Sequence, residues 1–152
     1  MRKRNIVLAL GAAPAAAALI SSCATSQHVA HSNLTVQCTE NRTGQDPTNG
    51  GVAGDGRCTI TGVVHDSGPA TDYRTQNGTT AIIRRVVTGA KGTITFLITI
   101  DLTSGREPWT ISSGTRTYAK LHGRGNEVVD NYSGSPATFV LKGTVSSSPS
   151  SD

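Results

Sequence analysis

Alternating apolar and polar residues are the clearest feature of this chain, and the pattern is strongest over residues 92–102. Every second residue there is apolar, and threonine fills most of the positions between. The apolar positions are Ile94, Phe96, Ile98, Ile100 and Leu102. Because side chains alternate between the two faces of an extended chain, this pattern predicts a strand with one buried face.

Similar alternation, or a short apolar run bounded by Gly, Asn, Ser or Pro, recurs along the chain. It predicts further strands over residues 34–37, 58–64, 80–87, 109–112, 127–132 and 139–145. Residues 88–91 form a turn-like link, which predicts a hairpin between the strands on either side. No window shows a sustained helical period of apolar residues, and the best helical turn is short, at residues 117–121.

About seven or eight short strands predict an all-β domain, either a sandwich or a closed barrel. Closure has the advantage that it removes exposed strand edges, which would otherwise pair with other chains. The strand pattern leaves both architectures open, and the domain is predicted to cover residues 34–145. The Ser-rich residues 146–152 are predicted to form a disordered tail.

A basic and then apolar segment precedes this domain. Arg2, Lys3 and Arg4 come first, and residues 6–20 are all apolar or small. A charged start followed by an apolar run of this length is typical of a secretory signal peptide and is too short for a spanning helix. Residues 1–22 are therefore predicted to be removed on export.

The end of the leader is compatible with two kinds of cleavage. The run Ile20-Ser21-Ser22-Cys23 resembles a bacterial lipobox, in which the cysteine thiol is acylated with diacylglycerol and becomes the new N-terminus. The favoured interpretation is a lipoprotein anchored through Cys23 on the outer side of the cytoplasmic membrane, with residues 23–33 as a polar tether. Alternatively, the small residues around Cys23 fit ordinary signal cleavage, which would release a secreted chain.

Most of the net positive charge lies in the leader. The whole chain has 14 Lys and Arg against 10 Asp and Glu, a net charge of +4. Without Arg2, Lys3 and Arg4 the balance is 11 against 10, or about +1. The charge therefore gives no evidence for a nucleic-acid partner.

Cys38 and Cys58 remain as one pair once Cys23 is assigned to the lipid. In an oxidising compartment they are predicted to form a disulfide. Residues 41–56 between them are rich in Gly, Asp, Asn, Thr and Pro, which predicts a loop with little structure of its own. Two free thiols are the alternative, and a metal site is disfavoured because neither cysteine has a partner at ligand spacing.

Residues 109–125 begin with Trp109 and contain a glycine-rich turn. This segment resembles part of the allene oxide cyclase and dirigent-like barrel proteins, which have a Gly-Thr-Gly-x-Tyr-Ala-Gly-Leu-x-Gly-x-Gly pattern. The matching residues are Gly114, Thr115, Tyr118, Ala119, Leu121, Gly123 and Gly125. Arg116 and Lys120 stand where the pattern has glycine, so the turn must accommodate side chains there.

The resemblance implies an all-β fold, a small antiparallel β-barrel of about eight strands over residues 34–145, of the kind carried by exported bacterial proteins. The plant cyclase activity is not carried over, because its catalytic residues cannot be placed on this chain. On physical grounds, Tyr118 and Leu121 lie three residues apart and are predicted to plug one end of the barrel. The alternative is that Tyr118 contacts a ligand.

Arg84 and Arg85 interrupt an apolar strand, so one guanidinium is expected on each face. A guanidinium that enters a lumen would hold an anion or a carboxylate. The favoured interpretation is instead a strand near an open edge or the barrel rim. Arg84, Arg85 and Tyr118 are the candidate ligand-binding residues.

Other titratable residues carry no recognisable catalytic or metal-binding motif. Asp46, Asp55, Asp66 and Asp72 lack the spacing of a calcium loop and are predicted to be solvated loop residues. The two histidines beyond the tether, at positions 65 and 122, are predicted to be exposed turn residues because no nucleophile motif accompanies them. No catalytic residue, metal site or cofactor is predicted.

Three functions follow from these expectations. The leading one is an envelope-anchored, non-enzymatic β-barrel that binds a small apolar or amphipathic ligand, or an envelope partner. The runner-up is an isomerase or cyclase of the same barrel class, in which Arg84 or Arg85, Tyr118 and a carboxylate surround a substrate. The third is a filled, stable module that presents loops to another protein.

Overall fold

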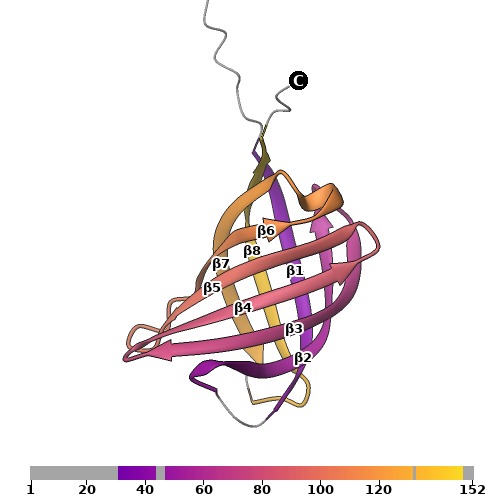
Figure 1. Ribbon diagram of the computed structural model, residues 1–152. Coiled ribbons are helices and arrows are strands. Elements are labelled where there is room, and N and C mark those ends of the chain that lie inside the picture. Colours follow the sequence, from indigo (N-terminus) through magenta and orange to yellow (C-terminus); the bar gives the residue numbers. More distant parts are fainter. Residues whose placement is uncertain (1–30, 44–46, 132, 149–152) are drawn as a thin grey trace, which may run out of the picture.

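Eight antiparallel strands close into a barrel in which each strand pairs with the next and β8 pairs with β1 (Figure 1). The computed structural model describes residues 31–43, 47–131 and 133–148. The strands are β1 (Ser32–Arg42), β2 (Asn49–Gly62), β3 (Asp66–Asn77), β4 (Thr80–Gly89), β5 (Gly92–Asp101), β6 (Pro108–Gly114), β7 (Leu121–Asn131) and β8 (Ala137–Ser147), with the 3-10 helix η1 (Arg116–Tyr118) between β6 and β7. The prediction of an all-β antiparallel barrel is confirmed.

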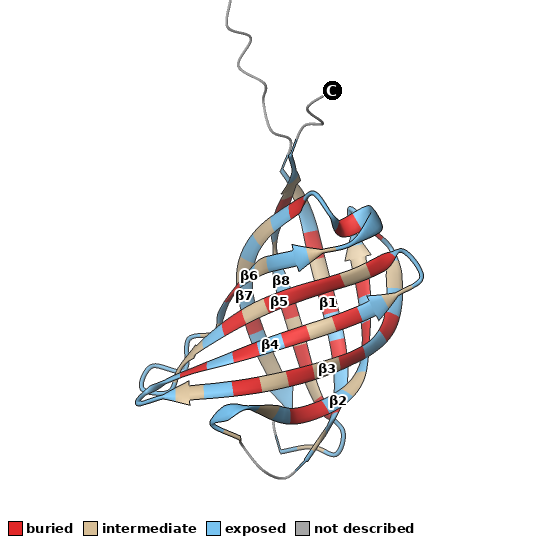
Figure 2. Ribbon diagram, in the orientation of Figure 1, coloured by how far each residue is buried: buried red, intermediate tan, exposed pale blue. Residues whose placement is uncertain are grey.

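The alternating pattern of the sequence becomes alternating burial along the strands (Figure 2). In β5, Ile94, Phe96 and Ile98 are fully buried and face the interior. Phe96 packs edge-to-face against Trp109 of β6, with ring centroids 5.6 Å apart. The Trp109 indole N–H donates to the backbone carbonyl of Asn126 at 3.2 Å, so the one polar atom of this core side chain is satisfied.

Two parts of the chain are more regular than the sequence pattern predicts. Residues 41–56 do not form one loop, because β1 continues to Arg42 and β2 starts at Asn49. The strand β3 has no counterpart among the predicted strands. Its inward positions include the charged Asp72 and Arg74, which are buried and so break the apolar alternation that marks the other strands.

The ends of the barrel differ in how they are covered. At the upper end in Figure 1, β1 begins, β8 ends and η1 connects β6 to β7. The strands extend beyond their predicted limits here, by two residues in β1 and β8 and by six in β7, since Ser32 pairs with Val145 and Leu121 pairs with Ser147. The lower end carries the β1–β2, β3–β4, β5–β6 and β7–β8 connections. No helix in the described part of the chain is long and apolar enough to cross a membrane.

Tyr118 of η1 is buried at the upper end and belongs to the apolar core. Its hydroxyl donates to Asp66 Oδ2 at 2.9 Å. The same carboxylate accepts the backbone N–H groups of Ser67, Ala90 and Lys91 at 2.9 to 3.1 Å. Asp66 therefore ties η1 to the β4–β5 turn and is not a freely solvated loop residue.

Replacing Tyr118 with phenylalanine is expected to lower the free energy of unfolding by about 1 kcal/mol, because one hydrogen bond to a charged acceptor is lost while the ring stays. Urea denaturation of the Tyr118→Phe protein measures the change. A Tyr73→Phe variant is the control, since the outward Tyr73 ring has no comparable bond to a carboxylate among the described contacts. Equal losses in both variants would show that the Asp66 contact contributes nothing.

Candidate functional site: a buried arginine among carboxyl groups

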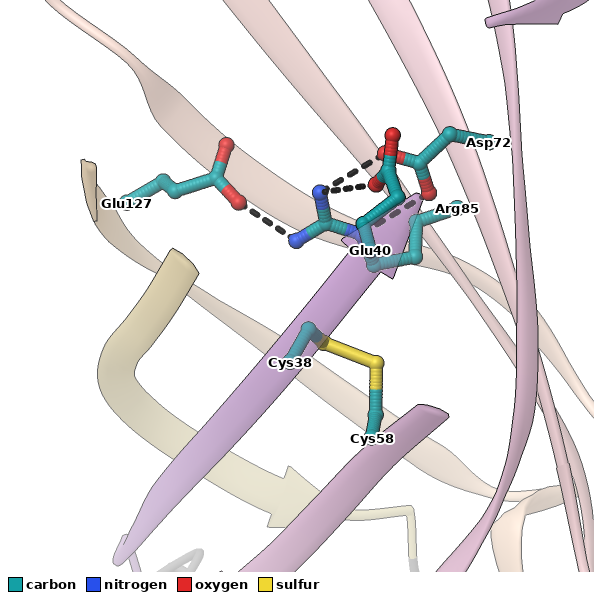
Figure 3. Close-up of a disulfide and its surroundings, with 6 residues drawn as sticks. All are labelled: Cys38, Glu40, Cys58, Asp72, Arg85 and Glu127. Atoms are coloured by element: carbon teal, nitrogen blue, oxygen red, sulfur yellow. Dashed lines mark hydrogen bonds and ion pairs between the residues drawn. A yellow bond between two sulfur atoms is a disulfide. The ribbon is translucent and has the colours of Figure 1, made fainter. Parts of the chain in front are cut away.

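The lower half of the lumen contains a fully buried arginine, Arg85, whose exposed fraction is 1%. Its guanidinium donates to Asp72 through two nitrogens, from Nε to Oδ1 at 2.9 Å and from Nη2 to Oδ2 at 2.7 Å (Figure 3). Nη1 donates to Glu127 Oε1 at 2.5 Å, and Nη2 lies 3.6 Å from Glu40 Oε2. One cation is therefore shared by three buried carboxyl groups.

Strand register explains why these groups meet. Asp72 of β3 lies directly opposite Arg85 of β4 in the antiparallel ladder, so both side chains project from the same face. Glu40 comes from β1 and Glu127 from β7, and barrel closure brings them to the same level of the lumen. The Arg85 guanidinium also lies over the Phe139 ring of β8, 4.8 Å from its centroid. The site therefore draws on five strands.

The charge state of the cluster is set mainly by burial. Burial raises the pKa of Glu40 to about 8, with further contributions from the charge of Asp72 and a hydrogen bond to it. Burial and the neighbouring Glu127 raise the pKa of Glu107 to about 7. Burial alone would lower the pKa of Arg85, but the charges of Asp72 and Glu127 outweigh it and raise that pKa. At neutral pH Arg85 is thus charged, Glu40 is mostly protonated and Glu107 is close to half protonated.

Glu40 is the least satisfied member of the cluster. Its exposed fraction is 4%, and its Oε1 atom has no hydrogen-bond partner among the described residues. Gly54 of β2 makes room for this carboxyl group, because a Cβ at position 54 would stand 2.0 Å from Glu40 Oε1. A buried oxygen without a donor costs free energy, so it is the natural contact point for water or a ligand group.

A small cavity of about 30 Å³ adjoins the cluster. It has room for about two water molecules. Its lining combines the charged groups with apolar side chains from several strands: Ala53, Ile83, Ile100, Val129 and Phe139. Arg42 and Arg74 also line it, and Arg74 donates to Gln76 Oε1 at 2.6 Å and to the Pro47 carbonyl at 3.3 Å. The cavity at the lower end of the lumen is therefore amphipathic, since charged and apolar side chains both line it.

The structure separates the three candidate ligand-binding residues. Arg85 points into the lumen, whereas Arg84 lies outside with its guanidinium 4.1 Å from the centroid of the Tyr73 ring. The expectation of one guanidinium on each face is confirmed, but the favoured edge or rim position is wrong, because β4 is paired on both sides within a closed barrel. Tyr118 lies at the upper end, about 20 Å from the cluster along β3.

The carboxyl groups of the site were not among the predicted site residues. Asp72 was predicted to be a solvated loop residue, which is wrong because it is buried in β3. The missed signal is an acidic residue at an inward position of an alternating strand. Glu40 follows Cys38 by two residues and Glu127 precedes Val129 by two, so each shares a face with a buried or half-buried apolar residue.

The remaining predictions concern the cysteines, the histidines and metal binding. Cys38 and Cys58 are joined by a disulfide, which confirms that prediction (Figure 3). His65 and His122 are exposed. Within the described ranges, no group of three or more His, Cys, Asp and Glu side chains is placed to hold a metal ion. Cys23 and the signal peptide lie outside the described residues.

Comparison of the chain with models of protein families, with curated proteins and with solved structures gave no match. The barrel architecture therefore stands on the strand pairing alone.

Replacing Glu40 with glutamine is expected to flatten the pH dependence of stability, most clearly above pH 7, where Glu107 is largely ionised. The Glu40 pKa rises from 4.5 in the unfolded chain to about 8 in the barrel, so the folded state binds more protons between these values. The resulting stabilisation is fully present below pH 4.5 and is lost as the pH rises through about 8. The free energy of unfolding should fall by about 1 kcal/mol per pH unit in this window.

Urea denaturation at several pH values from 5 to 8.5 measures this slope. The Glu40→Gln protein should show a flatter profile and exceed the wild type at the alkaline end, because the amide cannot ionise. Asp130→Asn, a change at an exposed carboxylate on β7, is the matched control and should keep the wild-type slope. A wild-type stability that rises with pH over this range would contradict the assignment.

Proposed function

We propose that this protein is an envelope-anchored lipoprotein whose barrel binds, without catalysis, a small amphipathic ligand at the lower end of the lumen. The lipobox ending at Cys23 supports the anchor, and the motif within residues 109–125 supports membership of the allene oxide cyclase and dirigent-like class. The observation that carries the binding function is Glu40 Oε1, a buried acceptor that receives no hydrogen bond from the described part of the chain and adjoins a partly apolar cavity.

The hydrogen-bond donors and acceptors of the site determine which kind of ligand it can bind. Three carboxyl groups converge on Arg85, and a fourth, Glu107, adjoins Glu127. Three N–H groups of Arg85 already donate to Asp72 and Glu127, and three carboxyl groups surround the guanidinium, so an anionic ligand would be repelled by them. A ligand with a hydrogen-bond donor, such as a hydroxyl or an ammonium group, instead finds an acceptor at Glu40. The apolar walls then contact the body of the ligand.

The cavity limits what enters. A volume of about 30 Å³ holds a head group and not a whole molecule, so the rest of the ligand extends toward the β1–β2 and β5–β6 connections. A polar head on an apolar stem fits this arrangement better than a wholly apolar ligand. An envelope protein that inserts a side chain of the same chemistry is the alternative occupant.

Native mass spectrometry of oxidised residues 27–152, exported by a bacterial host and followed by organic extraction, tests the binding function. A reproducible extra mass supports it. Glu40→Leu should weaken retention of that mass, because leucine removes the acceptor oxygen that the ligand needs, whereas Asp130→Asn should retain it. Equal retention in both variants would exclude the Glu40 site, and a bare chain would favour a partner-binding module.

The anchor is tested separately by the mass of the N-terminal peptide of the full-length protein produced in a bacterium. Acyl chains on Cys23 support the lipoprotein assignment, and Cys23→Ser should abolish them. An unmodified N-terminus at the other cleavage point would indicate a secreted soluble protein.

Acid–base isomerisation is the second candidate function. It is favoured by two carboxyl groups that titrate near neutral pH in one lumen, Glu40 with a pKa of about 8 and Glu107 with a pKa of about 7. Such groups can give and accept protons at physiological pH. Conversion of the extracted ligand by wild-type protein, lost in both Glu40→Gln and Glu107→Gln, would support this function over simple binding.

A further inference from the structure

Three exposed cations lie together at the upper end of the barrel. Lys91 is in the β4–β5 turn, Arg116 begins η1 and Lys120 follows it. Backbone contacts hold these segments next to each other, since Thr117 N–H donates to the Lys91 carbonyl at 3.2 Å. The Ser148 N–H donates to the Lys120 carbonyl at 3.0 Å, which places the end of β8 beside them. We call Lys91, Arg116 and Lys120 the basic end.

Acidic side chains are scarce around the basic end. The connections at this end, residues 63–65, 90–91 and 115–120, contain no Asp or Glu. Asp66, the first residue of β3, directly follows the first of these connections. It accepts hydrogen bonds from three backbone N–H groups and from Tyr118, and its single negative charge offsets one of the three cations. The basic end therefore presents a net charge of about +2 to the solvent.

Arg116 has a backbone conformation that is unfavourable for a residue other than glycine. Its φ angle is +50°, in the left-handed region that glycine adopts without cost and that disfavours a residue with a Cβ. Among the described residues it is the one non-glycine residue with positive φ. A cation held in an unfavourable conformation on an exposed turn points to a use for the charge.

The chain enters the barrel at this same end. β1 begins at Ser32, nine residues after Cys23. Nine residues span at most about 30 Å even when fully extended. A lipid on Cys23 therefore keeps the upper end within that distance of the membrane surface, whichever path the tether takes.

We infer that the basic end docks on the anionic headgroups of the membrane that holds the lipid anchor. The inference rests on the proposed anchor and adds an orientation to it. One lipidated residue plus a basic patch gives firmer attachment than the lipid alone, and positive charge is attracted to anionic headgroups at short range. Docking by the upper end turns the carboxyl cluster and its cavity away from the membrane, toward incoming ligand.

Chemical labelling of lysine amines on the acylated full-length protein tests the orientation. The protein is placed in vesicles of phosphatidylcholine alone, or of phosphatidylethanolamine with phosphatidylglycerol, and exposed briefly to a water-soluble amine-reactive ester. Lys91 and Lys120 should be protected in the anionic vesicles and labelled in the neutral ones. Lys142, exposed near the middle of β8, is the internal control and should be labelled equally in both. Added salt should abolish the protection.

Arg116→Gly is the decisive variant. It removes one charge and should reduce the protection of Lys91 and Lys120 about fivefold. Glycine also suits the positive φ at this position, so the variant should be at least as stable as the wild type, and lost protection cannot be ascribed to unfolding. Arg106→Gln removes a cation in the β5–β6 connection at the lower end and should leave the protection unchanged.

Two outcomes would overturn the docking. One is equal labelling of Lys91 and Lys120 in both kinds of vesicle, and the other is an equal effect of Arg116→Gly and Arg106→Gln. Failure of the anchor gives a different result, because an unacylated protein does not stay with phosphatidylcholine vesicles. In that case the same labelling, with the soluble protein and excess anionic vesicles, still decides whether the basic end docks.

Discussion

Replacing Arg85 with methionine is expected to lower the free energy of unfolding by about 3 to 5 kcal/mol at pH 8. Methionine fills much of the same volume but leaves Asp72 and Glu127 buried without the cation that both contact. The cost comes from uncompensated buried charge and not from the loss of favourable pairing, since an intact buried ion pair contributes little net stability. Lowering the pH to about 5 should reduce the loss, because the carboxyl groups can then take up protons.

The neighbouring arginine provides a matched control for this change. Arg84→Met removes the same side chain one position along the same strand, but from the outer face, where the guanidinium lies over Tyr73. It should cost no more than about 1 kcal/mol. Urea denaturation of both variants at pH 8 and pH 5 measures the difference, and equal costs would contradict a structural role for the cluster.

A combined variant identifies the cause of the destabilisation. Adding Asp72→Asn and Glu127→Gln to Arg85→Met removes the stranded charges and should restore much of the lost stability. If the triple variant is no more stable than Arg85→Met alone, the loss comes from packing against Phe139 and not from charge.

The barrel could be predicted from the sequence wherever the inward residues are apolar. The pattern over residues 92–102 predicted the whole of β5, because inward apolar residues such as Ile94, Phe96 and Ile98 alternate with polar ones. The similar pattern over residues 139–145 predicted the middle of β8. The strand β3 was missed because two of its inward residues, Asp72 and Arg74, are charged. From the local sequence alone, a charged residue on the buried face of a strand cannot be distinguished from a charged residue in a solvated loop.

The candidate site could be predicted only in part. Arg85 was identified because it interrupts an apolar strand, but its partners could not be, since they depend on which strands become neighbours in space. Glu127 is 42 residues away from Arg85 along the chain, and closure of the barrel brings their side chains together. The same holds for Asp66 and Tyr118, which are 52 residues apart. Local alternation gives the direction of a side chain, whereas register and closure decide what it meets.

Glycine gave a misleading signal in residues 41–56. Gly54 and Gly56 favoured a loop, yet both lie in β2, where neighbouring groups come too close for any side chain. The Cβ of residue 56 would stand 1.9 Å from the Thr39 carbonyl oxygen of the paired strand. A glycine that admits a close strand or a buried carboxyl group cannot be told from a turn glycine by composition alone.

Removing the disulfide is expected to have the second largest effect, a loss of about 3 kcal/mol in the free energy of unfolding. Cys38 and Cys58 are 20 residues apart in sequence, and the bond restricts the unfolded chain by closing that segment. In the folded barrel they are direct partners in the β1–β2 ladder and both are buried, so the cross-link joins strands that already pair. The stabilisation therefore acts mainly through the unfolded state.

A double variant, Cys38→Ala with Cys58→Ala, measures this contribution without leaving a free thiol in the barrel. Urea denaturation should show a midpoint well below that of the oxidised wild type and close to that of wild type unfolded in the presence of a reductant. The carboxyl cluster offers a second measurement, because Glu40 is two residues beyond Cys38 on the same strand and Arg42 pairs with Gly54. If the double variant keeps the native strand pairing, its free energy of unfolding should be lower overall but should still show the pH dependence assigned to Glu40. An oxidised wild type and a double variant that unfold at the same urea concentration would show that the β1–β2 ladder alone holds this side of the barrel.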